Sequence, residues 1–140
     1  MKPTKATLAL LLVLGAVQFL AAGSARAATT LNANQIKNLL VGKYACGSSG
    51  TEKWDEILAG GNTGSVTDYK KGPSDPRDPS AVVGSYTINN QTNTITYNYT
   101  SGGSYTYTIE DPNSAYPNPG IYTFVGPQTL TITVATSHCF

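Results

Sequence analysis

The stretch TITYNYTSGGSYTYTI, residues 94–109, decides the fold class. Each half alternates a large apolar side chain with a small polar one, and the apolar positions are Ile95, Tyr97, Tyr99, Tyr105, Tyr107 and Ile109. A period of two is typical of a β-strand with one apolar and one polar face. The central Ser101-Gly102-Gly103 has the composition of a tight turn, so the stretch predicts an antiparallel hairpin.

The same alternation continues on both sides of this hairpin. Residues 129–134 repeat it closely. Shorter or less regular strand candidates are 43–46, 52–58, 64–70, 82–88 and 120–125. Glycine-rich and asparagine-rich turns join most neighbours, which predicts an antiparallel meander of about eight strands. Two longer connections, 71–79 and 111–119, contain prolines and are predicted to be exposed loops.

The two cysteines, Cys46 and Cys139, indicate how the meander ends. Cys46 falls at the end of the first predicted strand, and Cys139 lies just beyond the last. A disulfide needs Cα atoms within about 7 Å, and unpaired strand edges are a liability. Pairing the first strand with the last satisfies both conditions. We therefore predict an all-β, antiparallel up-and-down barrel closed by this disulfide, with a β-sandwich as the alternative.

A short helix is predicted ahead of the first strand. Asn32 can cap it, and Gln35, three residues later, completes a capping box. Apolar side chains then form one stripe, and Gly42 suits a left-handed residue after the last turn. A helix of about two turns is not stable alone, so we expect it to pack on one end of the barrel.

The N-terminal residues predict export. Two lysines precede the apolar run 8–20, and small residues ending at Ala27 follow it, which is the layout of a cleaved secretory signal. The apolar run is shorter than the about 20 residues that span a bilayer. We predict a signal peptide over 1–27, one domain over 28–140, a secreted or periplasmic location and no membrane attachment after cleavage.

Charge and composition exclude several function classes. Without residues 1–27, the chain has six Lys and Arg and eight Asp and Glu. It therefore lacks the excess of basic residues that is typical of nucleic-acid-binding proteins. His138 is the only histidine, and we predict no metal site and no cofactor. Export carries the cysteines to a compartment where disulfides persist.

The segment Leu39-Leu40-Val41-Gly42-Lys43-Tyr44 combines a helical turn with a Gly-x-aromatic motif at the first strand. With the hairpin-linked strands that follow, the chain resembles the lipocalin-like (calycin) group of small meander barrels. Tyr44 replaces the family's usual tryptophan. The resemblance implies a barrel that binds a small apolar ligand or serves as a scaffold for protein contacts.

Five aromatic residues are the candidate ligand-binding set: Trp54, Tyr97, Tyr99, Tyr105 and Tyr107. Tyrosines on the apolar faces of neighbouring strands can line a cavity and offer rings and hydroxyls to a planar ligand. The alternative is that they fill a narrow barrel as cross-strand aromatic pairs, which the small size of the domain favours.

Glu56, paired with Asp55 or Asp68, is the best candidate for acid–base chemistry. Alternation places it on the same face as Trp54, and a carboxyl beside a buried aromatic can have a raised pKa. A core tryptophan beside solvated acids is the favoured alternative. His138 lies near the end of the chain, a poor place to hold a catalytic base rigidly.

The sequence contains no recognisable catalytic motif. Our hypothesis is therefore an exported, non-enzymatic barrel that binds a small apolar or planar molecule. A protein-binding barrel, such as a periplasmic protease inhibitor or surface-adhesion subunit, is the alternative. A carbohydrate-active enzyme that uses Glu56 is the third reading.

Overall fold

The computed structural model describes residues 27–72, 78 and 80–140, so nearly all of the predicted signal and most of the predicted loop 71–79 lie outside the described residues. Within the described residues the elements are β1 (Thr29–Thr30), α1 (Ala33–Leu40), β2 (Tyr44–Ser49), β3 (Glu52–Gly60), β4 (Thr63–Lys71), β5 (Ala81–Asn89), β6 (Thr94–Tyr99), β7 (Gly103–Asp111), β8 (Gly120–Val125) and β9 (Thr129–Ala135). Each predicted strand corresponds to one of β2 to β9.

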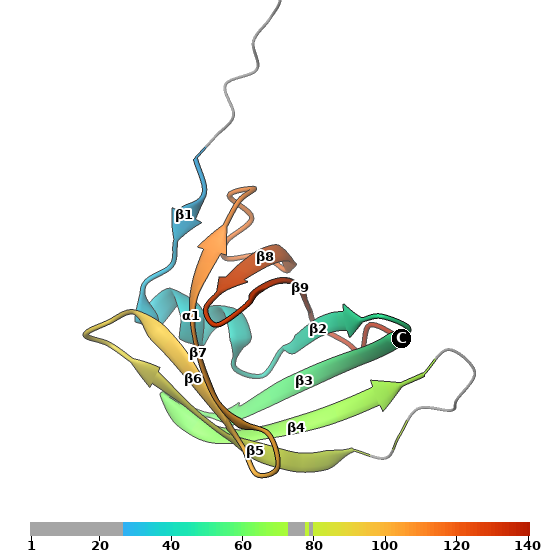
Figure 1. Ribbon diagram of the computed structural model, residues 1–140. Helices are drawn as coiled ribbons and strands as arrows, with labels where there is room; N and C mark the ends of the chain where they lie inside the picture. The colour runs from blue at the N-terminus through green and yellow to red at the C-terminus, as the bar shows by residue number, and fades with distance from the viewer. Residues whose placement is uncertain (1–26, 73–77, 79) are drawn as a thin grey trace, which may run out of the picture.

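Strands β2 to β9 form a closed barrel (Figure 1). Each strand pairs antiparallel with the next, and β9 returns to pair with β2, with Tyr44 opposite Ala135. The predicted up-and-down barrel of eight strands is confirmed, and the sandwich is excluded because the sheet has no break between two layers. The two-residue β1 pairs with the end of β7. Sequence reasoning missed it because two residues carry no alternation.

The predicted disulfide is present and lies at the closure of the sheet. Cys46 and Cys139 are bonded, with Cα atoms 6.2 Å apart. Cys46 also pairs with Thr133 of β9 through the backbone. The covalent bond and the β2–β9 hydrogen bonds therefore hold the same two segments together.

The helix α1 packs on one end of the barrel. Its capping box is formed as predicted, with Asn32 and Gln35 exchanging side-chain and backbone hydrogen bonds of 3.0 and 2.8 Å. Gly42 has a φ of +75°, the left-handed conformation expected there. The Ala33 N–H donates to Asn93 in the β5–β6 turn. The apolar face of α1 is buried against the barrel.

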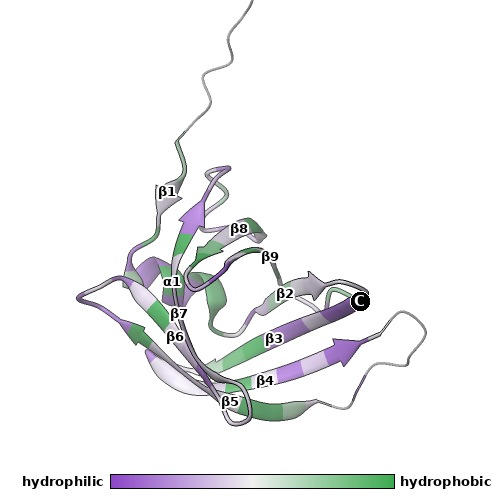
Figure 2. Cartoon of the chain, viewed as in Figure 1, coloured by the Kyte–Doolittle hydropathy of each residue, from purple (hydrophilic) through white to green (hydrophobic). Residues whose placement is uncertain are grey.

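The two ends of the barrel differ in polarity. The half beside α1 is filled by buried aliphatic and aromatic side chains, among them Leu58, Val66, Ile88, Ile95 and Ile109. Figure 2 shows β3 changing from hydrophilic at its start to hydrophobic toward its end, and β4 becoming hydrophilic where it finishes. The polar ends of these neighbouring strands lie together, away from α1.

Asp111, at the end of β7, anchors the connection 111–119. Its side chain is only 3% exposed and accepts backbone N–H bonds from Asn113, Ala115 and Tyr116. Burial alone would raise the pKa of Asp111, but these hydrogen bonds lower it below its ordinary value. The connection that follows is exposed or half-buried over 112–119, as predicted, and the buried carboxylate of Asp111 at the end of β7 organises its backbone.

Candidate functional site

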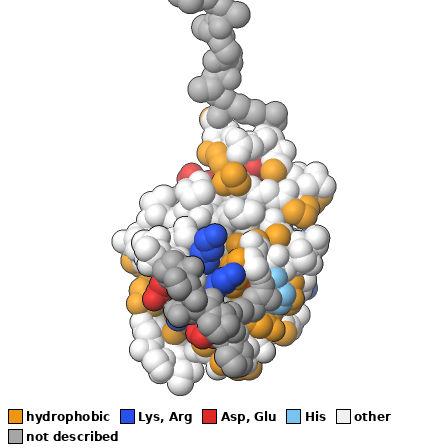
Figure 3. Space-filling view, turned by 90° about the vertical axis from the view of Figure 1, so that its right-hand side faces the viewer, with side chains coloured by type: hydrophobic (Ala, Val, Ile, Leu, Met, Phe, Trp, Pro, Cys, Tyr) orange, Lys and Arg blue, Asp and Glu red, His pale blue; other side chains and the backbone are white. Residues whose placement is uncertain are grey.

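A cavity of about 840 Å³ occupies the half of the barrel away from α1. Its mouth is formed by the turns that join β2 to β3, β6 to β7 and β8 to β9, together with the start of β5. The lining residues nearest the mouth are Ser48, Ser49, Glu52, Lys70, Val82, Ser101, Gly102 and Gln128. Figure 3 views the side of the molecule where β2 and β4 end, and basic and hydrophobic side chains lie together there.

All five aromatic residues proposed from the sequence line this cavity. Tyr97 and Tyr99 are stacked, with ring centroids 6.0 Å apart and planes 8° apart. Tyr107 meets Tyr97 edge-on at 6.3 Å, and Tyr105 meets Tyr99 edge-on at 6.0 Å. The rings therefore form cross-strand and along-strand pairs, yet they leave the interior open. The cross-strand aromatic pairs expected as the alternative are thus present, and the same rings also line the cavity.

Glycines make room for two parts of the aromatic wall. Gly47 lies opposite Trp54 across the β2–β3 pair, and a Cβ added at Gly47 would collide with the indole ring. A Cβ at Gly126 would likewise meet the ring of Tyr107. The prediction from sequence overlooked both glycines, and it also overlooked Phe124, which packs beside Tyr107 at 5.8 Å.

A carboxyl group lies inside the cavity and is held by a tyrosine. Glu56 is 8% exposed, and its Oε1 accepts a 2.7 Å hydrogen bond from the hydroxyl of Tyr99. This bond connects β6 to β3 across the interior. Burial raises the pKa of Glu56 from 4.5 to about 7; Tyr99 and Lys70 oppose the rise, whereas the charge of Asp68 adds to it.

Asp68 lies directly opposite Glu56 on the neighbouring strand β4 and also lines the cavity. Its Oδ2 is 3.4 Å from Lys70 Nζ, and the lysine side chain is 57% exposed. Burial raises the pKa of Asp68, although the Lys70 charge opposes this. Glu56 and Asp68 are therefore two acids on one part of the wall, and the solvated Lys70 lies beside Asp68.

The sequence predicted that the two acids next to Trp54, Asp55 and Glu56, are solvated, but both are buried. Asp55 has no exposed surface and Glu56 has little, so the favoured sequence reading of both residues is wrong. Strand alternation sends them to opposite faces: Glu56 faces the cavity, and Asp55 faces outward, where the C-terminal segment covers it. The suggested pairing of Glu56 with Asp55 is therefore excluded, whereas Glu56 and Asp68 do share the cavity.

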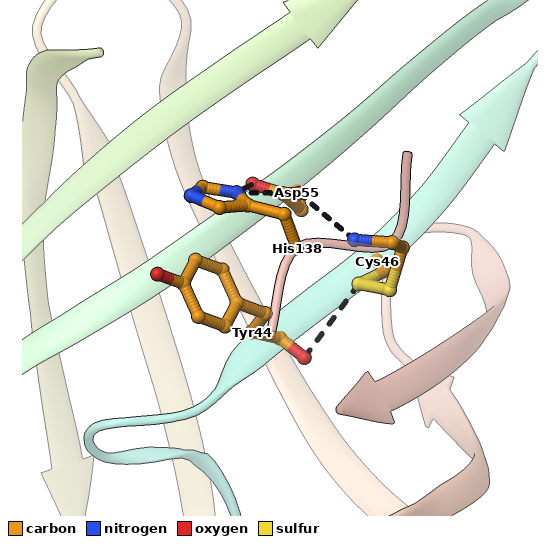
Figure 4. A network of polar contacts seen from close by, with 5 residues as sticks. Tyr44, Cys46, Asp55 and His138 are labelled. Carbon is orange, nitrogen blue, oxygen red and sulfur yellow. Dashed lines mark hydrogen bonds and ion pairs between the residues drawn. A yellow bond between two sulfur atoms is a disulfide. The ribbon is translucent and has the colours of Figure 1, made fainter. Parts of the chain in front are cut away.

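The C-terminal segment holds Asp55 by two groups (Figure 4). His138 Nδ1 lies 3.0 and 3.1 Å from the two carboxylate oxygens, and the backbone N–H of Cys139 donates to one of them at 3.4 Å. The imidazole also contacts the rings of Tyr44 and Tyr69, with centroids 4.2 and 4.3 Å away. The expectation that His138 is poorly fixed is wrong, because the adjacent disulfide and these contacts position it.

Two further features concern metal ligands and membrane-spanning helices. Among the described residues, no cluster of three or more His, Cys, Asp or Glu side chains is arranged to hold a metal ion. No helix in the described part of the chain is long and apolar enough to cross a membrane. The cavity is lined by aromatic rings together with the carboxyl-bearing residues Glu52, Glu56 and Asp68.

The fold and the cavity define a closed eight-stranded antiparallel barrel with a helix at one end and an aromatic cavity open at the other. Comparison of the chain with family models, curated proteins and solved structures finds no match. The architecture is consistent with the lipocalin-like resemblance at a coarse level, and membership of that group stays a prediction.

Proposed function

We propose that this chain is an exported, non-enzymatic binding protein whose barrel holds a small apolar or planar molecule. The cavity of about 840 Å³ is the observation that carries the proposal. Small-molecule sites typically measure about 300–1,000 Å³, are mostly apolar and contain a few polar groups that orient the ligand. The aromatic wall and the Glu56–Tyr99 hydrogen bond correspond to these two components.

Export is supported by the signal-like residues 1–27 and is consistent with the disulfide between Cys46 and Cys139. Disulfides persist outside the cytosol, where no thiol pool reduces them. A secreted or periplasmic binding protein meets its ligand in the same compartment.

The tryptophan provides a direct test, because Trp54 is the only one in the chain and lines the cavity. The neutral probe N-phenyl-1-naphthylamine is expected to increase in emission on binding and to quench Trp54. The variant Tyr105→Ala removes one ring from the wall and is expected to weaken binding about three- to tenfold, as expected for loss of aromatic contacts. The control is Ile121→Ala, since Ile121 is 49% exposed and lies outside the cavity.

The proposal is contradicted if neither this probe nor a thermal-shift panel of neutral hydrophobic compounds binds. It is also contradicted if Tyr105→Ala and Ile121→Ala change the affinity equally, because binding would then occur outside the cavity.

Carbohydrate hydrolysis is a second candidate, favoured by the raised pKa of Glu56 beside Asp68. Glycosidases place two carboxyl groups on either side of the scissile bond, whereas these two lie on adjacent strands of one wall. Release of nitrophenol from a panel of nitrophenyl glycosides, abolished by Glu56→Gln, would establish the enzyme; no release would remove it.

A further inference from the structure

Two buried polar atoms on residues that line the cavity have no hydrogen-bond partner among the described residues: the Tyr97 hydroxyl and Asp68 Oδ1. Tyr97 is 3% exposed and Asp68 is 8% exposed. Buried polar atoms are nearly always hydrogen-bonded. The other deeply buried tyrosines, Tyr86 and Tyr122, follow this rule and donate to backbone carbonyls at 2.8 and 2.7 Å. The two unpaired atoms therefore mark where a ligand's polar group is expected.

The charge around these atoms is negative. Among the described residues, three acidic ones, Glu52, Glu56 and Asp68, line the cavity together with one lysine. Lys70 contacts Asp68 at 3.4 Å but is more than half exposed, so solvent screens its charge strongly. A cation in the cavity would be attracted by the acids, whereas an anion would be repelled. The two buried acids, Glu56 and Asp68, therefore favour a positively charged ligand over a negatively charged one.

The rings beside the acids also favour a cation. The faces of aromatic rings carry partial negative charge and attract cations within about 6 Å of the ring centroid. Burial raises the pKa of Tyr97 and of Tyr99, so both hydroxyls stay neutral and keep their protons. Tyr97 and Tyr99 stack on each other, and both residues line the cavity.

We propose that the ligand is a planar organic cation, with its amino group beside the carboxyl groups of Glu56 and Asp68 and its ring against the tyrosines. The Asp68 oxygen that lacks a partner accepts an N–H from the amine, and the Tyr97 hydroxyl contacts the same end of the molecule. This inference deepens the proposed function and rests on it, since it names the chemical class for the same cavity.

Binding is expected to depend on pH because a cation pairs best with an ionised carboxyl. The pKa of Glu56 is about 7 in the free protein, and a bound cation lowers it. Affinity is therefore greatest above about pH 7 and falls as the pH decreases through this value, because protons then compete with the ligand. The titratable groups that interact with Glu56 are Asp68, Lys70, Tyr97, Tyr99 and Tyr107, and Glu52 also lines the cavity.

The test compares three naphthalene compounds that differ in charge: 2-naphthylmethylamine, 2-naphthalenemethanol and 2-naphthoate. Titration calorimetry with the full exported domain measures each affinity at about pH 8, where Glu56 is mostly ionised. The amine is expected to bind about tenfold tighter than the alcohol or better, as expected for a charged buried hydrogen bond. The carboxylate compound is expected to bind weakest. In Glu56→Gln and in Asp68→Asn, the preference for the amine is expected to fall about tenfold.

The controls separate this inference from the proposed function. Both variants are expected to retain binding of N-phenyl-1-naphthylamine, which shows that the cavity is still folded. Glu110→Gln, a matched change of a residue outside the cavity, is expected to leave the preference for the amine intact. Equal binding of amine and alcohol, tighter binding of the carboxylate, or an amine preference unchanged in both cavity variants would overturn the inference. If the neutral probe still binds in any of these cases, only the preference for a cation is refuted, and the proposed small-molecule binding function stands.

Discussion

Replacing Glu56 by glutamine is expected to stabilise the protein at neutral and alkaline pH and to change little in acid. The side chain is 8% exposed, and its pKa rises from 4.5 to about 7 on folding. Between these two values the unfolded chain loses the Glu56 proton while the folded chain keeps it. The folded state therefore becomes less stable, relative to the unfolded state, as the pH rises through this window.

The magnitude follows from the width of the window. An interval from 4.5 to about 7, at about 1.4 kcal/mol per pH unit, corresponds to about 3 kcal/mol. Glutamine does not titrate, and its side-chain oxygen can still accept the hydrogen bond from Tyr99. The free energy of unfolding of Glu56→Gln is thus expected to match the wild type near pH 4 and to exceed it by about 3 kcal/mol near pH 8.

Urea unfolding followed by Trp54 fluorescence measures this difference at a series of pH values. Subtracting the wild-type free energy of unfolding at each pH cancels the contributions of the other titrating groups.

The control is Asp111→Asn, because the pKa of Asp111 is lowered by its backbone hydrogen bonds despite the opposing effect of burial. Asp111 stabilises the fold above its unfolded pKa, and this stability is lost as the pH falls through the folded value. Asp111→Asn is therefore expected to destabilise most at neutral pH. A Glu56→Gln difference that does not rise with pH would refute the reasoning.

Three other predictions concern the closure of the barrel and its wall. Replacing Cys46 and Cys139 by serine opens a loop of 93 residues and is expected to lower the urea-unfolding free energy by about 4 to 5 kcal/mol; a loss below about 1 kcal/mol would contradict the entropic account. Gly47→Ala adds a Cβ where the Trp54 ring lies, so the tryptophan emission maximum is expected to shift, and an unchanged spectrum would refute this contact. His138→Ala leaves a fully buried carboxylate with fewer partners and is expected to cost about 2 kcal/mol in the same unfolding assay; unaltered stability would show that the contact is weak.

The fold was largely predictable because its signals are local. The period-two pattern of residues 94–109 identified a hairpin, and β6 and β7 occupy that stretch. The capping box of α1 needs only Asn32 and Gln35, three residues apart. Closure was predictable for a different reason, since Cys46 lies in the first barrel strand and Cys139 lies just after the last.

The candidate site was predictable only in part. Alternation placed the five aromatic residues on inward faces, but it could not show whether their rings leave space. The environments of Asp55 and Glu56 depend on what covers them. Asp55 is buried by residues more than 80 positions away, and Glu56 is held by Tyr99 from across the barrel.

By itself, the amino-acid sequence determined the strand order, the helix at the start of the barrel and the disulfide that joins its ends. These features depend on the periodicity of side chains and on the conformational preferences of neighbouring residues. Only the tertiary structure decided that the interior holds a cavity, that Glu56 and Asp68 both line it, and that Asp68 Oδ1 and the Tyr97 hydroxyl have no hydrogen-bond partner among the described residues. Cavity volume and desolvation depend on the packing of side chains from distant strands, which no local pattern contains.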